Sequence, residues 1–433
     1  MKTYHYPEVG ETLYKTTLPN GLQVAVLPRP GFTKKLCYFV TNYGAIHRAF
    51  TMDGTDYLAP AGVAHYLEHK LFDMPGRDIT GEFAALGAVP NAFTSFDMTA
   101  YYFSCTENFK ENLSLLLEFV TTPYFTEESV AKEQGIIGQE IDMNADNPDS
   151  RLFELLTEVM YEHHPIHTPI LGTRESIGQI TPQVLEDCHM AFYQPGNMFL
   201  CVVGDVDPQE VARLAESKLQ DLPCPTVTAI RTWDEPLDVQ EHYATCSMEV
   251  AMPMFQLGFK CAALPDGEEG VRQEIIGDLA AEALFGESSR LYLKLYDEGL
   301  IDASFGGGYE TIEGMSMLLA SGDSENPDAV RDAILEEAKR LAEAGIPQED
   351  FLRMKRSALG RRIRSLDSFE ATCFRLCAYH FSKFDYFRIP KIYEQVTKEE
   401  IQEFIQNVVI QNRMCMAVIT PKKGGLIYEL DCR

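Results

Sequence analysis

Residues 61–71 read AGVAHYLEHKL, and within this stretch His65, Glu68 and His69 form an HxxEH pattern. On a helix, residues three and four apart point the same way, so these three side chains share an arc of about 100°. The apolar residues of the stretch fall on the opposite side and would pack against a core. The sequence therefore predicts a short helix that carries two imidazoles and a carboxylate on its free face.

Two neutral imidazoles four residues apart on a helix can bind one Zn²⁺, and a glutamate beside them can take a proton from water. The alternative is a helix whose polar face carries two solvated or hydrogen-bonded histidines and no metal. A third protein ligand would distinguish the two, because catalytic zinc usually has three.

The segment 127–143, EESVAKEQGIIGQEIDM, predicts a second helix, in which Glu133 and Glu140 interrupt an apolar stripe. A carboxylate on a buried face is costly unless it is paired or binds a metal. We expect Glu140 to be the third ligand. We expect Glu133 to contact one of the ligands, and not the metal, and so to support the site. The alternative is a pair of salt bridges beneath the helix.

The order of these motifs, HxxEH followed by E-x6-E with 71 residues from His69 to Glu140, resembles the pitrilysin, insulinase and mitochondrial processing peptidase family. These are inverted-motif zinc proteases. The stretch 91–103, NAFTSFDMTAYYF, is similar to a strand beside that family's active site. The stretches LPNGLQVAVLPRP and QPGNMFLCVVGDVD also resemble family members, so the resemblance spans nearly the whole chain.

This resemblance implies a zinc metalloendopeptidase or processing peptidase with one Zn²⁺ per chain, although Mn²⁺ or Co²⁺ tolerates similar ligands. The implied metal ligands are His65, His69 and Glu140, with Glu68 as the general base and Glu133 behind the ligands. A peptide substrate would add to a sheet edge through backbone hydrogen bonds. The implied substrate-binding residues are Asn91, Ala92 and Phe93.

With 433 residues, 45% of them hydrophobic, the chain has enough material for two domains. The apolar strands at 197–207, NMFLCVVGDVD, and 412–423, NRMCMAVITPKK, end comparable stretches of the chain, which indicates two related halves. We expect an α+β fold of two homologous domains, each an antiparallel-rich sheet packed with helices, that together form half of a clam-shell chamber. The predicted boundaries are 1–219 for the zinc-bearing domain, 220–238 for a linker and 239–433 for a domain without metal.

Local patterns predict several further elements. Helices are expected at 211–219, 327–344 and 348–364, and a strand at 254–261. The stretch 277–295 would correspond to the metal helix of the first half, but it contains no histidine. A second histidine cluster, His163, His164 and His167, is interrupted by Pro165, so we expect an exposed loop there.

The chain has a net charge of −28 and a pI near 4.7, which argues against nucleic acid or an anionic membrane as a partner and slightly favours a basic peptide substrate. Residues 1–30 contain acids and prolines and no continuous apolar core, so we expect neither a signal peptide nor a membrane helix.

The eleven cysteines lie mostly among apolar neighbours, as reduced cysteines do in the cytoplasm. Cys373 and Cys377 share a helical face, but no second ligand pair stands nearby.

The chain departs from the family in its second half. Many members place an Arg and a Tyr after an SSRLY-like motif to hold the substrate carbonyl and stabilise the oxyanion. Here Ser288 to Tyr292 has that motif, but Tyr296 stands where the Arg is expected and Asp302 near the Tyr position. The resemblance therefore implies a dimer, more readily a heterodimer with a zinc-less paralogue than a homodimer.

Three readings of function remain open on the sequence. The first is the zinc peptidase, which most resembles the paired bacterial members associated with elongation factor P modification or bacteriocin production. The second is a catalytically weak scaffold or binding subunit that keeps the peptidase fold. The third is a metal-dependent hydrolase of a non-peptide amide.

Overall fold

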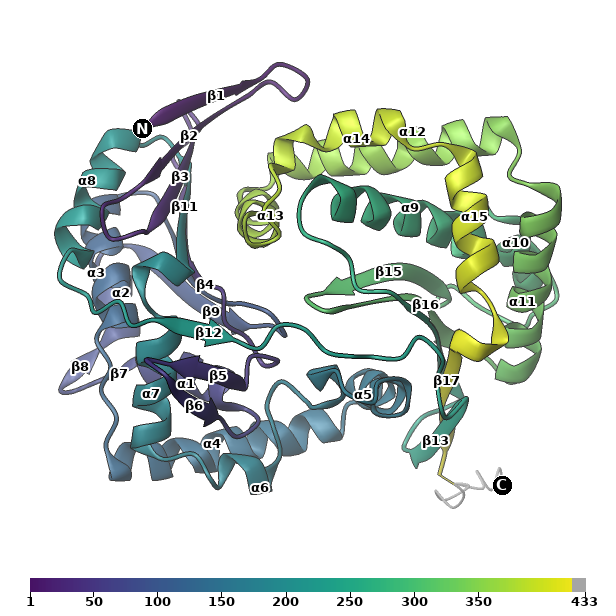
Figure 1. Ribbon diagram of the computed structural model, residues 1–433, viewed down its shortest axis with the longest axis horizontal. Helices are drawn as coiled ribbons and strands as arrows, with labels where there is room; N and C mark the ends of the chain where they lie inside the picture. The colour runs from purple at the N-terminus through teal and green to yellow at the C-terminus, as the bar shows by residue number, and fades with distance from the viewer. Residues whose placement is uncertain (423–433) are drawn as a thin grey trace, which may run out of the picture.

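The computed structural model describes residues 1–422 and contains two large β-sheets, one in each half of the chain (Figure 1). The first sheet has the order β1-β2-β3-β11-β4-β10-β9, and the second has the order β13-β17-β14-β16-β15. The strands of the first sheet are β1 (Lys2–Tyr6), β2 (Glu11–Thr17), β3 (Gln23–Pro28), β4 (Lys35–Thr41), β9 (Ala88–Thr94), β10 (Thr99–Cys105) and β11 (Met198–Gly204). Those of the second are β13 (Tyr243–Met248), β14 (Met254–Cys261), β15 (Gly306–Ile312), β16 (Met315–Asp323) and β17 (Met414–Pro421).

The two sheets share one topology. In the first, β3 pairs with β11 in parallel, and β11-β4-β10-β9 follow in antiparallel order. In the second, β13 pairs with β17 in parallel, and β17-β14-β16-β15 follow in antiparallel order. The predicted α+β fold of two homologous halves is therefore confirmed. The three predicted strands correspond to β11, β14 and β17, except that Lys423 lies outside the described residues.

Helices pack on both sheets. Those of the first half are α1 (Val63–Leu71), α2 (Ile79–Ala85), α3 (Phe109–Thr121), α4 (Glu127–Ala145), α5 (Pro148–Met160), α6 (Arg174–Ile177), α7 (Pro182–Phe192) and α8 (Pro208–Leu219). Those of the second are α9 (Glu268–Phe285), α10 (Arg290–Asp297), α11 (Pro327–Ala344), α12 (Gln348–Arg364), α13 (Phe369–Phe381), α14 (Ile389–Gln395) and α15 (Lys398–Val408). The helices predicted from local patterns correspond to α1, α4, α8, α11 and α12.

The halves exchange one helix each. Helix α13 contacts β11 and β4 of the first sheet, where Cys373 and Leu376 share a core with Tyr38 and Phe199. Helix α5 contacts β14 and β17 of the second sheet. Figure 1 shows both helices end-on in the space between the sheets. Each sheet is therefore covered by a helix from the other half, and the boundaries at residues 219 and 239 stay a prediction.

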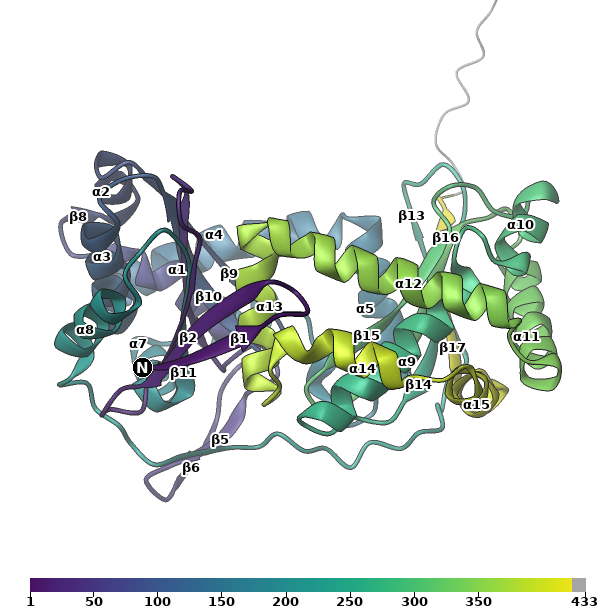
Figure 2. The same cartoon turned by 90° about the horizontal axis from the view of Figure 1, so that it is seen from above.

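The segment 220–238 crosses from the first half to the second along one side of the molecule (Figure 2). It forms one short strand, β12 (Val227–Ala229), which pairs with β5 (Ala49–Met52) beside β6 (Thr55–Leu58). Near its end, the Glu235 carboxylate accepts hydrogen bonds from the backbone N–H groups of residues 162–164 and forms an ion pair with Lys260. These contacts hold the segment against both halves.

The prediction that the second histidine cluster forms an exposed loop is wrong for His164. Its ring is fully buried and packs against Trp233, with ring centroids 4.4 Å apart. Nε2 lies 2.9 Å from the backbone carbonyl of Glu313, and Nδ1 accepts from the N–H of Ile166 at 3.1 Å. Both ring nitrogens of His164 are therefore engaged by backbone groups, whereas the neighbouring His163 is exposed.

Eight of the ten cysteines within the described residues are buried, and all ten are free thiols. Within residues 1–422, no helix combines the length and the apolar character that crossing a bilayer requires.

Candidate metal centre

Helix α1 begins after Gly62, which has a φ of 91° in the left-handed region. A Cβ at this position would lie 2.6 Å from the carbonyl oxygen of Leu171, so glycine lets the two segments approach closely. The back of the helix is buried as predicted, through Val63, Ala64, Leu67 and Leu71. Its other face is left to the two histidines and Glu68.

Helix α4 lies against α1. It starts with a capping box, in which Thr126 and Ser129 satisfy each other's backbone N–H groups. The Tyr66 hydroxyl of α1 donates to the backbone carbonyl of Val130 and ties the helices together. The side chain of Glu133 is 14% exposed, and that of Glu140 is 43% exposed. The expectation that both glutamates lie on a buried face is therefore wrong for Glu140, whose side chain is only partly buried.

The structure brings His65, His69 and Glu140 together. One possible ligand atom from each residue lies within 4.8 Å of the others. Nε2 of His65 is 3.6 Å from Glu140 Oε1, and Nε2 of His69 is 3.5 Å from Glu140 Oε2. Within residues 1–422 this is the only group of three or more His, Cys, Asp or Glu side chains in such an arrangement.

Glu133 lies behind His69. Its Oε1 is 2.9 Å from Nδ1 of His69, and because a carboxylate only accepts, the imidazole donates. That hydrogen bond places the proton on Nδ1 and leaves the lone pair of Nε2 directed at the site. This is the arrangement that a metal-binding histidine usually has with its supporting carboxylate.

The two imidazoles have different proton affinities. Burial, and then the charge of His69, lowers the pKa of His65 to about 3, so its ring is neutral, as a metal ligand must be. Burial also lowers the pKa of His69, but the hydrogen bond to Glu133 and the nearby carboxylates outweigh it, and the pKa is raised. The carboxylates of the site therefore favour a positive charge at its centre.

Glu68 lies on the same face and is held by Thr94 of β9, whose hydroxyl donates to Glu68 Oε2 at 2.7 Å. Burial raises the pKa of Glu68 despite this hydrogen bond. A carboxylate whose pKa moves towards neutrality is a better proton acceptor near pH 7. Thr94 was not predicted as part of the site, although it directly follows the Asn91–Phe93 stretch.

The donor set fits Zn²⁺. It consists of two imidazole nitrogens and one carboxylate, which is a typical three-ligand set for a catalytic zinc ion. One imidazole is fixed in the required tautomer by Glu133, and the other is neutral. Nδ1 of His65 is buried without a hydrogen-bond partner among the described groups. The roles of these residues as ligands stay a prediction.

Asn91, Ala92 and Phe93 lie on β9, the terminal strand of the first sheet. Side chains alternate along a strand, so Ala92 and Thr94 face α1, whereas Asn91 and Phe93 face the side covered by α13. The free edge of β9 therefore runs beside Glu68. The part of these residues in substrate binding stays a prediction.

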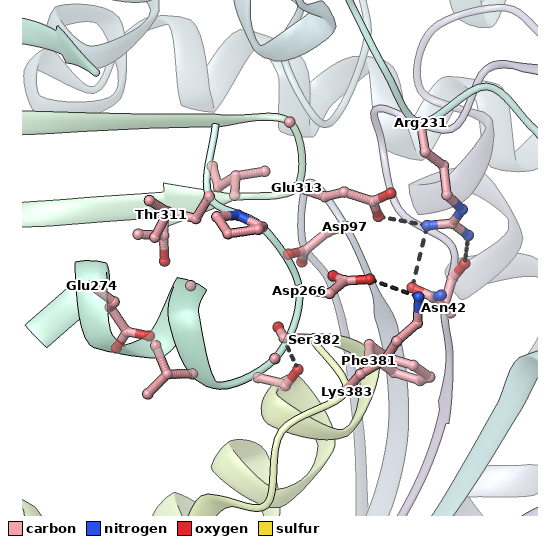
Figure 3. Close-up of a pocket in the computed structure, with 18 of the residues that line it drawn as sticks. Asn42, Asp97, Arg231, Asp266, Glu274, Thr311, Glu313, Phe381, Ser382 and Lys383 are labelled. Carbon is pink, nitrogen blue, oxygen red and sulfur yellow. Dashed lines mark hydrogen bonds and ion pairs between the residues drawn. The ribbon is translucent and has the colours of Figure 1, made fainter. Parts of the chain in front are cut away.

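A separate cavity of about 320 Å³ lies between the halves (Figure 3). On one side Arg231 donates to the Asn42 carbonyl at 2.8 Å and pairs with Glu313 at 2.5 Å. Beside Asn42, Lys383 pairs with Asp266 at 2.7 Å (Figure 3). Arg231 therefore bridges the first half and the β15–β16 turn, a contact that local sequence patterns did not predict.

Comparison with known proteins assigns the chain to a family. Residues 55–174 match the family model described as Insulinase (Peptidase family M16), and residues 179–358 match the one described as Peptidase M16 inactive domain. The chain is 37% identical over 431 residues to "Uncharacterized zinc protease YmfH" of Bacillus subtilis, covering 98% of this chain and 100% of that protein.

Two further matches are informative. The crystal structure of a putative M16-like peptidase from Alicyclobacillus acidocaldarius superposes with a TM-score of 0.91 at 33% identity, covering 95% of this chain and 99% of that one. The beta subunit of the Caenorhabditis elegans mitochondrial-processing peptidase is 27% identical over 289 residues, covering 65% of this chain and 59% of that protein. The chain therefore belongs to the insulinase family, peptidase family M16.

Proposed function

We propose that this chain is a zinc metallopeptidase that hydrolyses extended peptides and acts as the metal-bearing subunit of a dimer. The observation that carries the proposal is the convergence of His65, His69 and Glu140, with Glu68 on the same face. The zinc would be held by these two histidines and Glu140, one ion per chain. The names of the relatives support the same chemistry.

The chemistry that zinc supplies in such a donor set is Lewis-acid activation of water and of the substrate carbonyl. Glu68 takes the proton from the attacking water and can pass it to the leaving amine. The Thr94 hydroxyl fixes Glu68 in position, because it donates to the carboxylate oxygen. Glu133 keeps His69 in the tautomer that directs Nε2 inward.

The substrate would be an extended peptide that adds to the free edge of β9. Asn91, Ala92 and Phe93 would pair with it through backbone N–H and carbonyl groups. A strand edge contacts the backbone and every second side chain of a bound peptide, so it suits oligopeptides better than small amides. This favours the peptidase over a hydrolase of a non-peptide amide.

The second half of the same chain does not complete the site. Tyr296 and Asp302 occupy the positions where oxyanion donors are expected, and α10 lies at the opposite end of the molecule from α1 in both views (Figures 1 and 2). Hydrogen bonds from Ser304 lower the pKa of Asp302, so its carboxylate stays ionised and cannot donate. A partner chain is therefore part of the proposal, either a zinc-less paralogue or a second copy.

We place the chain in the cytoplasm, with the paired bacterial members associated with elongation factor P modification or bacteriocin production. The cytoplasmic placement is supported by the cysteines within the described residues, which are all free thiols. The word subunit in the name of the Caenorhabditis elegans relative agrees with a partnered enzyme.

Replacement of Glu68 by Gln tests the proposal. Glu68→Gln removes the base and keeps the size of the side chain, so zinc and fold should be retained while hydrolysis of an oligopeptide library falls by about 10²- to 10⁴-fold. Equal rates for Glu68→Gln and the native chain would contradict a peptidase and favour the scaffold. The native rates must be measured with the partner present.

A further inference from the structure

Four aromatic side chains form a row on the α13-facing side of the first sheet. The rings of Tyr38 on β4 and Tyr102 on β10 stack with centroids 4.4 Å apart. Tyr102 meets Phe93 of β9 edge to face at 6.2 Å, and Phe93 lies 5.9 Å from Phe374 of α13. We call Tyr38, Tyr102, Phe93 and Phe374 the aromatic row.

The aromatic row runs from the interior of the sheet to its free edge. Tyr38 is 4% exposed, whereas Phe374 is 43% exposed. Tyr38 and Tyr102 are direct cross-strand partners, and Phe93 is the diagonal neighbour of Tyr102 across the next strand pair. The row therefore follows the pairing direction and ends where the next strand would be added.

Phe374 is not one of the residues that α13 buries. The residues that α13 buries are Phe369, Thr372, Cys373, Leu376, Cys377 and Tyr379. Phe374 reaches the edge of the first sheet only because α13 comes from the second half and covers this face (Figures 1 and 2). An exposed aromatic ring on a fixed helix, beside the free edge of a terminal strand, is suited to contact an added segment.

We propose that Phe374 determines substrate specificity by forming, with Phe93, a site for an aromatic or bulky aliphatic side chain of the bound peptide. This rests on the proposed function, in which an extended peptide adds to β9. Such a strand places every second side chain on the face of Phe93 and Phe374, and the remaining side chains on the face of α1 and Glu68. The peptide side chain nearest Phe93 would pack against Phe93 and Phe374 at the end of the aromatic row.

A peptide series tests this. The peptides are extended and labelled, and differ at one position at a time, which carries Phe, Leu, Ala or Asp. Dissociation constants are measured by fluorescence anisotropy on the zinc-loaded Glu68→Gln chain, and kcat/KM on the active chain with its partner. One aromatic contact corresponds to a preference of about threefold to tenfold for Phe over Ala.

We expect this preference at one position of the peptide, and we expect Phe374→Ala to remove it while the Ala peptide binds as before. Phe374→Leu should restore the preference in part. Phe32→Ala is the matched control, because Phe32 is 56% exposed and its ring packs against that of Phe369 of α13, with centroids 5.6 Å apart. The control should keep the full preference.

Two results overturn the inference in different ways. If the peptides bind but Phe374→Ala keeps the full preference, Phe374 does not determine specificity and the peptidase proposal stands. If no peptide binds or is cleaved by the zinc-loaded chain with its partner, the proposed function fails and the inference fails with it.

Discussion

Nδ1 of His69 donates to Oε1 of Glu133 at 2.9 Å, and this hydrogen bond links the metal-facing side of α1 to α4 in the candidate metal centre. Glu133 lies on α4 two turns before Glu140, so in the proposed site one helix would supply both a ligand and the carboxylate that supports another ligand. We therefore expect the zinc affinity of the proposed site to depend on Glu133, a residue that would not touch the metal.

Glu133→Gln should weaken zinc binding by about tenfold to a hundredfold, because a neutral amide holds the His69 imidazolium or imidazole less firmly than a carboxylate does. Competition with a chromogenic chelator at fixed pH measures the affinity. Glu128→Gln, an exposed position on the same helix, is the matched control and should bind zinc as the native chain does. Equal affinities in all three proteins would show that Glu133 has no supporting role.

Residues 1–219 produced alone should not fold to a stable domain. The first sheet would lose α13, which exposes the apolar surface around Tyr38, Phe199 and Cys201. Size-exclusion chromatography and thermal unfolding followed by circular dichroism measure the result. Co-expression of residues 1–238 with 239–433 should recover a soluble complex. A monodisperse, cooperatively unfolding fragment 1–219 would contradict the importance of the exchanged helix.

Glu235→Gln should lower the free energy of unfolding by about 3 kcal/mol near pH 7, because it leaves the buried Lys260 ammonium without its counter-charge. Asp238→Asn, an exposed change in the same segment, should have little effect. Urea unfolding curves at several pH values measure the difference between the native chain and each variant.

The pH dependence of that difference follows from the pKa of Glu235. Burial raises it, but Lys260 and the three backbone N–H donors outweigh burial and lower the pKa to about 2. A carboxyl whose pKa is lower in the folded state stabilises that state fully above its unfolded value of about 4.3. The stabilisation should therefore fade as the pH falls from about 5 towards 2. A difference that stays constant down to pH 2 would contradict this assignment.

Peptide hydrolysis should depend on a partner chain. Loss of one oxyanion donor costs about 10²- to 10³-fold in rate, so dilution to a monomer should lower the specific activity by that order. Sedimentation at each concentration identifies the species present. Full activity in a sample shown to be monomeric would mean that this chain carries its own donors.

The helices of the candidate metal centre could be predicted from the sequence because their signals are local. The spacing of His65, Glu68 and His69 and the apolar back of α1 follow from helical periodicity alone. The exposure of Glu140 could not be predicted in the same way. A residue at the margin of an apolar stripe is buried or exposed according to what packs beside it, and no local pattern records that.

Long-range packing accounts for the other differences. The exchange of α5 and α13 depends on which sheet each amphipathic helix meets, and both sheets offer a similar apolar face. His164 is buried because Trp233, far along the chain, closes over it. The aromatic row had a partial signal, since Tyr38, Tyr102 and Phe93 occupy one face of their strands, but the position of Phe374 required the structure.

The most direct test of the proposed metal site is the metal content of the purified chain beside that of Glu140→Gln. We expect one zinc ion per native chain and a marked loss in Glu140→Gln, with the fold of the variant checked by circular dichroism. A native chain without bound metal, or a folded Glu140→Gln chain that keeps its full zinc content, would contradict the assignment of His65, His69 and Glu140 as the ligands.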